Sequence, residues 1–256
     1  MQKKGEKMDK NAKIGIFDSG IGGVTVLKEI LKVLAQEDII YYSDSKNNPY
    51  GDKTNEEILN YSEEITKFLI DKGCKAIVIA CNTASASSAQ FLRGKYKEIP
   101  IIAIEPAYKM VHDYAYSKGT LVLATKATIE SEKFNLLFNK YDNHKTILLP
   151  CVGLAEIIEE GNIEKVKEYL KDKLTQYCGK IENVVLGCTH YPLIKKEIKE
   201  ILGNVQFFDG APNLARHLKE VLDNKDMLAN NTGKIEFIDS KKSQEKEKRF
   251  FEILNK

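Results

Sequence analysis

The chain has 256 residues, of which 43% are hydrophobic and 30% are charged. This length suits two modest domains or one large domain, and the composition is ordinary for a soluble globular enzyme. The formal net charge is only +2, from 39 basic and 37 acidic residues, so we expect neither a nucleic-acid partner nor an anionic membrane surface. The apolar runs are too short to span a bilayer.

The N-terminal residues 1–12 are polar and Lys-rich, with no apolar segment behind the positive charges. We therefore expect a short polar extension and no secretory signal. The five cysteines are odd in number, and no two of them form a CxxC pair. These features predict free thiols in a reducing cytoplasm and no metal site.

Short runs of apolar, often β-branched residues alternate with longer amphipathic segments along the whole chain. In the first half, strands are predicted at residues 14–17, 39–42, 76–80 and 100–104, with helices at 24–36, 56–72 and 84–96. In the second half, strands are predicted at 121–124, 147–149, 184–186 and 205–208, with helices at about 131–140, 163–177 and 193–201. A weaker strand at 235–238 and a charged helix at 244–254 close the chain. Continuous apolar runs between helices indicate parallel strands that are buried on both faces.

The two halves repeat one spacing at the ends of three strands. The matching pairs, each 107 residues apart, are Asp18 and Thr125, Asp44 and Cys151, and Cys81 and Cys188. This constant offset predicts an α/β fold of two pseudo-symmetric parallel-sheet domains. Because ligands of open parallel sheets bind beyond the carboxyl ends of the strands, the active site is expected in the cleft between the domains. Cys81 and Cys188 would then approach one ligand from opposite sides.

Cys81 and Cys188 each leave a buried strand and precede hydrogen-bonding residues at an expected helix start, Asn82-Thr83 and Thr189-His190. Backbone N–H groups at a helix N-terminus stabilise anions. Both thiols are therefore expected to ionise more readily than free cysteine, whose pKa is about 8.5. A lone cysteine at a strand end is more often plain packing, which is the interpretation for Cys74, Cys151 and Cys178. The equivalent positions and polar successors of Cys81 and Cys188 favour chemistry instead.

Two equivalent thiols suit the inversion of an amino acid at its α-carbon. A thiolate removes the proton from one face, and a thiol supplies a proton to the other. No Schiff-base lysine with a phosphate cradle is evident, and the glycines of residues 18–23 (DSGIGG) form no GxGxxG fingerprint. We therefore expect no cofactor, with the acidity of the α-carbon coming from desolvation and hydrogen bonds.

Five segments carry a family resemblance: residues 17–23 (FDSGIGG), 48–51 (NPYG), 80–85 (ACNTAS), 123–128 (LATKAT) and 187–193 (GCTHYPL). In order and spacing they resemble the signatures of bacterial glutamate racemases, over about residues 13–210. The resemblance implies cofactor-independent interconversion of L-glutamate and D-glutamate, supply of D-glutamate for peptidoglycan, and a homodimer. The predicted domains are residues 13–105 plus 213–256, and residues 106–212.

The same resemblance assigns the site residues by position. The family's two catalytic cysteines correspond to Cys81, acting on the D-enantiomer, and Cys188, acting on the L-enantiomer. Assisting catalytic roles are implied for Asp18, His190 and Glu159. The implied substrate-binding residues are Asp18, Ser19, Tyr50, Gly51, Asn82, Thr83, Thr125, Thr128, Thr189 and His190.

Other interpretations stay open on the residues alone. An aspartate racemase, or another racemase of the same superfamily, would share the two thiols. A cysteine hydrolase or amidase would use Cys188 as nucleophile and His190 as base, and would leave Cys81 idle. A small-molecule binding module would have unreactive thiols. Asp18 itself could simply cap the helix that follows it.

Overall fold

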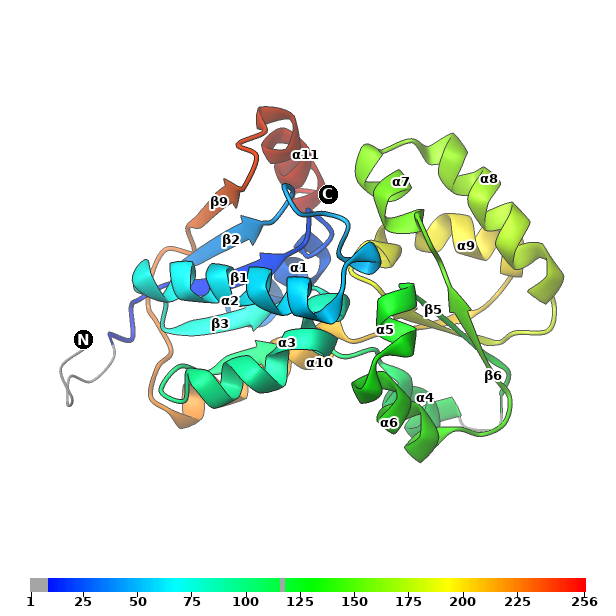
Figure 1. Ribbon diagram of the computed structural model, residues 1–256, viewed down its shortest axis with the longest axis horizontal. Helices are drawn as coiled ribbons and strands as arrows, with labels where there is room; N and C mark the ends of the chain where they lie inside the picture. Colours follow the sequence, from blue (N-terminus) through cyan, green and yellow to red (C-terminus); the bar gives the residue numbers. More distant parts are fainter. Residues whose placement is uncertain (1–8, 116–117) are drawn as a thin grey trace.

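The computed structural model describes residues 9–115 and 118–256, so most of the predicted N-terminal extension, residues 1–8, lies outside the described residues. Two parallel sheets form the cores of the two halves of the molecule (Figure 1). The N-terminal half holds a five-stranded sheet and the other half a four-stranded sheet. The chain is therefore an α/β protein of two parallel-sheet domains, as predicted.

The first sheet has the strand order β4-β3-β1-β2-β9, and every neighbouring pair is parallel. Its strands are β1 (Ile14–Asp18), β2 (Ile39–Ser43), β3 (Ala76–Ile79), β4 (Ile101–Ala103) and β9 (Ile235–Asp239). Strand β1 is buried along its whole length because helices cover both faces. Ile14 and Ile16 pack on the core beneath one set of helices, whereas Phe17 packs on the other, as the alternation of side chains along a strand requires.

Five α-helices cover this first sheet. Helices α1 (Val24–Val33), α10 (Ala211–Asn224) and α11 (Gln244–Leu254) share one core with it, and α2 (Asn55–Asp71) and α3 (Asn82–Lys95) share the other. A short 3-10 helix, η1 (Tyr50–Asp52), lies between β2 and α2. The last two elements of the chain, β9 and α11, thus return to the first sheet, consistent with a domain built from two chain segments.

The second sheet has the order β6-β5-β7-β8 and is also entirely parallel. Its strands are β5 (Thr120–Ala124), β6 (Thr146–Pro150), β7 (Asn183–Gly187) and β8 (Gln206–Asp209). The helices of this half are α4 (Tyr108–Ala115), α5 (Lys126–Glu130), α6 (Glu132–Tyr141), α7 (Leu154–Glu160), α8 (Ile163–Leu174) and α9 (Lys195–Leu202), with the 3-10 helices η2 (Thr175–Tyr177) and η3 (Tyr191–Ile194). None of the helices in the described ranges is both long enough and apolar enough to cross a bilayer.

The internal repeat is visible in the strand order. The order β4-β3-β1-β2 of the first sheet corresponds to β8-β7-β5-β6 of the second. The residue pairs that are 107 positions apart lie at the carboxyl ends of equivalent strands, β1 and β5, β2 and β6, and β3 and β7. The predicted pseudo-symmetry is therefore confirmed at the level of topology.

Several helices differ from the sequence prediction. Helices α4, α5, α7 and α10 were not predicted, because α4, α5 and α7 are short and depend on tertiary packing rather than on a long apolar period. Helix α10 has Pro212 in its first turn, where the missing N–H of proline costs no hydrogen bond within the helix. The helix predicted at 193–201 is instead a 3-10 turn, η3, followed by α9, and the helix predicted at 163–177 ends at Leu174 and continues as η2.

Candidate active site between the two sheets

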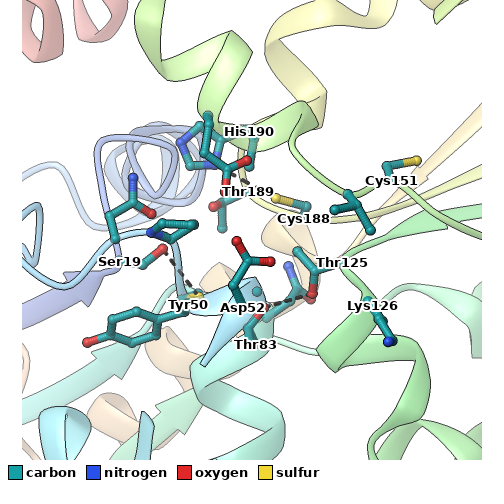
Figure 2. Close-up of a pocket in the computed structure, with 18 of the residues that line it drawn as sticks. Ser19, Tyr50, Asp52, Thr83, Thr125, Lys126, Cys151, Cys188, Thr189 and His190 are labelled. Atoms are coloured by element: carbon teal, nitrogen blue, oxygen red, sulfur yellow. Dashed lines mark hydrogen bonds between the residues drawn. The ribbon is translucent and has the colours of Figure 1, made fainter. Parts of the chain in front are cut away.

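A narrow cleft lies between the carboxyl ends of the two sheets and is lined by residues of both halves. In Figure 2 the labelled side chains surround one open space, with Ser19 and Thr83 from the first half and Thr125 and Cys188 from the second. Ten predicted site residues line it: Ser19, Tyr50, Gly51, Cys81, Asn82, Thr83, Thr125, Cys188, Thr189 and His190. The other three, Asp18, Thr128 and Glu159, lie behind this lining.

Cys81 occupies the N-cap position of α3, directly after β3. Its sulfur accepts a hydrogen bond from the backbone N–H of Ala84 at 3.4 Å and donates to the Ser19 hydroxyl at 3.7 Å. The chain turns from strand to helix here with an extended backbone at Cys81, which is usual for an N-cap residue. The predicted placement of this thiol at a helix N-terminus is confirmed.

The expected easy ionisation of Cys81 is wrong in this structure. Burial and, after it, the nearby Asp18 carboxylate raise the pKa of the Cys81 thiol to about 12, because together they outweigh the stabilising N–H of Ala84. Cys81 is only 6% exposed, so the loss of water around the charged form is nearly complete. A negative charge on Cys188 also raises this pKa, which means that the two sulfurs affect one another across the cleft.

Cys188 has different surroundings from its counterpart. It follows β7 directly, but the next element is the 3-10 helix η3, whose second residue is Pro192. Pro192 has no N–H, and the N–H of Tyr191 bonds to the carbonyl of Cys188 rather than to its sulfur. The partner of the Cys188 sulfur is instead His190 Nδ1, at 3.7 Å. A helix does begin at Thr189-His190, but it is the 3-10 helix η3 with His190 at its N-cap. The sulfur of Cys188 contacts the imidazole of His190 rather than the backbone amides that were expected.

His190 is held by Glu159 from behind the cleft. His190 Nε2 lies 2.6 Å from a carboxylate oxygen of Glu159, and both side chains are almost fully buried. Burial alone would raise the pKa of Glu159, but His190 and Lys246 outweigh it and lower the pKa to about 2. Burial alone would lower the pKa of His190, but its contacts with Cys188 and Glu159 raise it well above the ordinary value. Cys188, His190 and Glu159 thus form a series of contacts in which His190 bridges the thiol and the carboxylate.

Asp18 ends β1 and lies beneath the cleft floor, fully buried. One carboxylate oxygen accepts from the backbone N–H of Gly20 at 3.1 Å, and the other accepts from the Thr189 hydroxyl at 3.2 Å. Burial raises the pKa of Asp18 to about 6, although the charge of His190 and the N–H of Gly20 act in the opposite direction. Asp18 therefore links the two halves and organises the glycine-rich loop after β1.

Threonine hydroxyls from both halves meet on one side of the cleft. Thr83 lies 2.9 Å from Thr125 and 3.3 Å from Thr128, measured between hydroxyl oxygens. Thr125 also caps α5 by accepting from the N–H of Thr128. Next to them, Oδ1 of the buried Asn82 has no hydrogen-bond partner among the described residues. A buried amide oxygen without a partner is unfavourable.

The hydroxyl of Tyr50 bonds to Asp44 and is not directed to a ligand in the cleft. That hydroxyl donates to the buried carboxylate of Asp44 at 2.7 Å, and the ring is 1% exposed. Tyr50 and Gly51 therefore present the backbone of η1 to the cleft. Nine further residues that the sequence did not single out as site residues also line the cleft: Asn48, Pro49, Asp52, Lys126, Cys151, Val152, Gly153, Ala155 and Glu156. The only sequence signal for any of them was adjacency to the NPYG and ATKAT segments and to the end of β6.

No group of three or more metal-ligating side chains with suitable geometry occurs in the part of the chain that the structure describes. The donors that line the cleft are thiols, hydroxyls, amides, one imidazole and the Lys126 ammonium, beside the carboxylates of Asp52 and Glu156. Such a set can bind carboxylates and move protons.

Comparison with known proteins identifies the family. The sequence profile of the Asp/Glu/Hydantoin racemases matches residues 14–218. A glutamate racemase of Clostridium perfringens is 45% identical over 254 residues, covering 95% of this chain and 98% of the relative. The chain belongs to the glutamate racemase family. As a member of this family it is an isomerase, so the interpretations as a hydrolase and as a non-catalytic binding module are not supported.

Solved structures of the glutamate racemase family show the same fold. A glutamate racemase isoform from Bacillus anthracis superposes with a TM-score of 0.85 at 31% identity, covering 96% of this chain and 95% of that one. A glutamate racemase from Francisella tularensis in complex with D-glutamate gives 0.82 at 33% identity, with coverages of 96% and 95%. The agreement spans both sheets and the cleft between them.

Proposed function

We propose that this protein interconverts L-glutamate and D-glutamate without a cofactor, by moving the α-proton between Cys81 and Cys188. The observation that carries the proposal is that both sulfurs, from equivalent strand ends of the two sheets, line one cleft. The glutamate racemase of Francisella tularensis, solved with D-glutamate, supports the choice of substrate. Supply of D-glutamate for peptidoglycan, a homodimeric assembly and a cytoplasmic location are part of the same proposal and rest on the family resemblance.

The reaction needs one thiolate and one thiol. In the direction from L-glutamate, the Cys188 thiolate takes the α-proton, the electron pair of the C–H bond stays on the α-carbon, and the Cys81 thiol protonates the opposite face. The enzyme then carries a thiolate at Cys81 and a thiol at Cys188, the state that begins the reverse reaction. The mutual repulsion of two thiolates disfavours the loss of both protons, and a pKa of about 12 fits Cys81 as the acid in this direction.

The remaining cleft residues have roles that follow from their position. The hydroxyl of Thr83 and the side-chain amide of Asn82 line the cleft and can donate hydrogen bonds to substrate carboxylates. His190, fixed by Glu159, assists Cys188, while Ser19 and the N–H of Ala84 stabilise charge at Cys81. Desolvation in the cleft strengthens each of these interactions when the carbanion forms.

Hydrogen exchange in D₂O tests the two-base scheme. When racemisation starts from one enantiomer, α-deuterium should appear first in the product, and recovered substrate should stay protiated at early times. Equal early labelling of both enantiomers would contradict transfer between two separate thiols. Parallel assays with aspartate test the substrate, because a dominant aspartate activity would overturn the choice of glutamate.

Serine substitutions test each thiol separately. Cys81→Ser and Cys188→Ser should each reduce kcat by at least about 100-fold, since a serine hydroxyl is a poor base and a far weaker acid near neutral pH. Cys178→Ser is the matched control, because Cys178 is exposed and lies outside the cleft. Substantial racemisation by Cys81→Ser would overturn the assigned role of Cys81.

A further inference from the structure

Helix α11, close to the C-terminus, reaches the active-site histidine through one side chain. Lys246 Nζ lies 2.5 Å from Oε1 of Glu159, the carboxylate that holds His190. Helix α11 belongs to the first half, where Phe250 packs on Tyr41 with ring centroids 4.6 Å apart, whereas Glu159 lies on α7 of the second half. Figure 1 shows α11 and α7 facing one another across the junction of the halves.

The Glu159 carboxylate uses both of its oxygens at this junction. Oε2 is 2.6 Å from His190 Nε2 and accepts the backbone N–H of Ile21 at 3.3 Å, while Oε1 contacts Lys246. The Glu159 side chain is only 6% exposed, so water does little to replace a lost partner. Without Lys246, Oε1 would have no hydrogen-bond partner within the described residues, and the carboxylate would lose one of the three contacts that fix its orientation.

The orientation of Glu159 fixes the imidazole of His190 relative to Cys188. An ionised carboxylate can only accept, so His190 Nε2 donates to Glu159. Because these contacts raise the pKa of His190 well above its ordinary value, Nδ1 also carries a proton and can donate to the Cys188 sulfur, 3.7 Å away, which stabilises the thiolate. Cys81 has no comparable arrangement, because its partners Ser19 and Ala84 lie in its own half and its sulfur contacts no imidazole.

We propose that Lys246 is a positioning residue for Cys188, acting through Glu159 and His190 from the opposite half of the molecule. This inference rests on the proposed function for its consequence in turnover, but its structural part, the reactivity of one thiol, stands separately. This chain of contacts, Lys246–Glu159–His190–Cys188, is called the relay below, and it connects the junction between the halves to only one of the two thiols. The two thiols occupy equivalent positions in the fold but have different supporting residues.

Turnover alone cannot reveal this asymmetry. The two enantiomers have equal free energy in water, so any substitution must change kcat/KM equally in both directions. A measurement on each thiol is therefore needed. The rate of alkylation by iodoacetamide follows the thiolate fraction and the accessibility of a cysteine, and peptide mapping by mass spectrometry resolves Cys188 from Cys81 in one sample.

The test compares Lys246→Met with the wild-type chain. We expect alkylation of Cys188 to slow by about tenfold, the scale of one charge-assisted hydrogen bond, and alkylation of Cys81 to change by less than about twofold. Lys246→Arg, which keeps the charge and the donors, should restore the rate. In the glutamate assay, kcat should fall in Lys246→Met and recover in Lys246→Arg.

Arg249→Gln is the matched control, because Arg249 also joins α11 to α7 but donates to the carbonyl of Ile158 and not to Glu159. Its Cys188 alkylation should stay within about twofold of the wild type. Equal slowing in Arg249→Gln and Lys246→Met would show that loosening the junction is sufficient, and would overturn the role through Glu159. Unchanged Cys188 alkylation in Lys246→Met would overturn it too. If the wild-type chain does not racemise glutamate, the proposed function is overturned. The alkylation rates of Cys188 would still test whether Lys246 acts on that thiol.

Discussion

The Thr189 hydroxyl donates a hydrogen bond to the Asp18 carboxylate over 3.2 Å, joining the strand-end loops of the two sheets. The carbonyl of Thr189 also accepts from the Thr25 hydroxyl at 2.9 Å. Thr189, which follows Cys188, therefore forms hydrogen bonds to the first half through both its side chain and its backbone. The position of Cys188 relative to Cys81 depends on these contacts between the halves as much as on either sheet.

The glycines after β1 make room for the residues that support Cys188. A Cβ atom on Gly22 would lie 2.5 Å from His190 Nδ1, and one on Gly20 would collide with the Glu159 carboxylate. We expect Gly22→Ala to displace the imidazole and to reduce kcat by about 10- to 100-fold, the range for misplacement of a catalytic group by roughly 1 Å. Steady-state racemisation assays on the purified variant, checked by thermal unfolding, measure this effect.

Gly94→Ala provides the control for this prediction. Gly94 lies exposed near the end of α3, and a Cβ atom there meets nothing within 4 Å. Alanine should stabilise the helix by about 0.5–1 kcal/mol and leave kcat unchanged. If Gly22→Ala kept full activity, the imidazole would have to tolerate displacement, and its assisting role at Cys188 would be untenable.

The sequence was most informative where burial imposes a simple pattern. The nine strands of the described residues lie within one residue of their predicted ends. The inner strands β1, β3, β5 and β7 are buried along their length and are mainly apolar runs, whereas the edge strands β6, β8 and β9 are partly exposed. The offset of 107 residues between Cys81 and Cys188 predicts both thiols at equivalent strand ends. Strand-end position is a property of local sequence and topology, so it could be predicted.

Contacts between the halves could not be predicted in the same way. Glu159 and His190 are 31 residues apart, and Lys246 is 87 residues from Glu159, with no periodicity that connects them. The raised pKa of Cys81 was also missed, because helix capping is visible in the sequence but the burial that outweighs it is not. Both the contacts of Glu159 and the pKa of Cys81 depend on how the two halves pack around the cleft.

The buried Asp18 makes stability depend on pH. Its pKa in the folded state is about 6, above the value of 3.8 for an unperturbed aspartate, because burial penalises the charged form. The stabilisation that follows from a raised pKa is fully present below pH 3.8 and is lost as pH rises through 6. The contribution of Asp18 to the free energy of unfolding should therefore fall by on the order of 3 kcal/mol across this window.

Asp18→Asn isolates this contribution, because asparagine cannot ionise. Urea unfolding of both proteins between pH 4 and pH 7 should give a difference in free energy that shifts in favour of the variant as pH rises. Glu159 does not confuse this window, since its pKa is lowered to about 2 and its own contribution is lost only as pH falls below 4.5. A difference between the two proteins that is constant over pH would show that Asp18 does not titrate in this range.

The opposite end of the first sheet holds a buried ion pair that serves stability alone. Lys75 Nζ lies 2.6 Å from Glu37 Oε2, with side chains 0% and 2% exposed, at the amino ends of β3 and β2 and away from the cleft. Glu37→Gln leaves a buried ammonium without its counter-charge, so we expect a loss of about 3–5 kcal/mol in urea unfolding, with kcat unchanged. Lys13→Met, which breaks the half-exposed pair with Glu236, should cost far less because solvent screens that pair. Equal losses in the two variants would mean that burial adds nothing to the Lys75–Glu37 interaction, and a fall in kcat would mean that the two ends of the sheet are coupled.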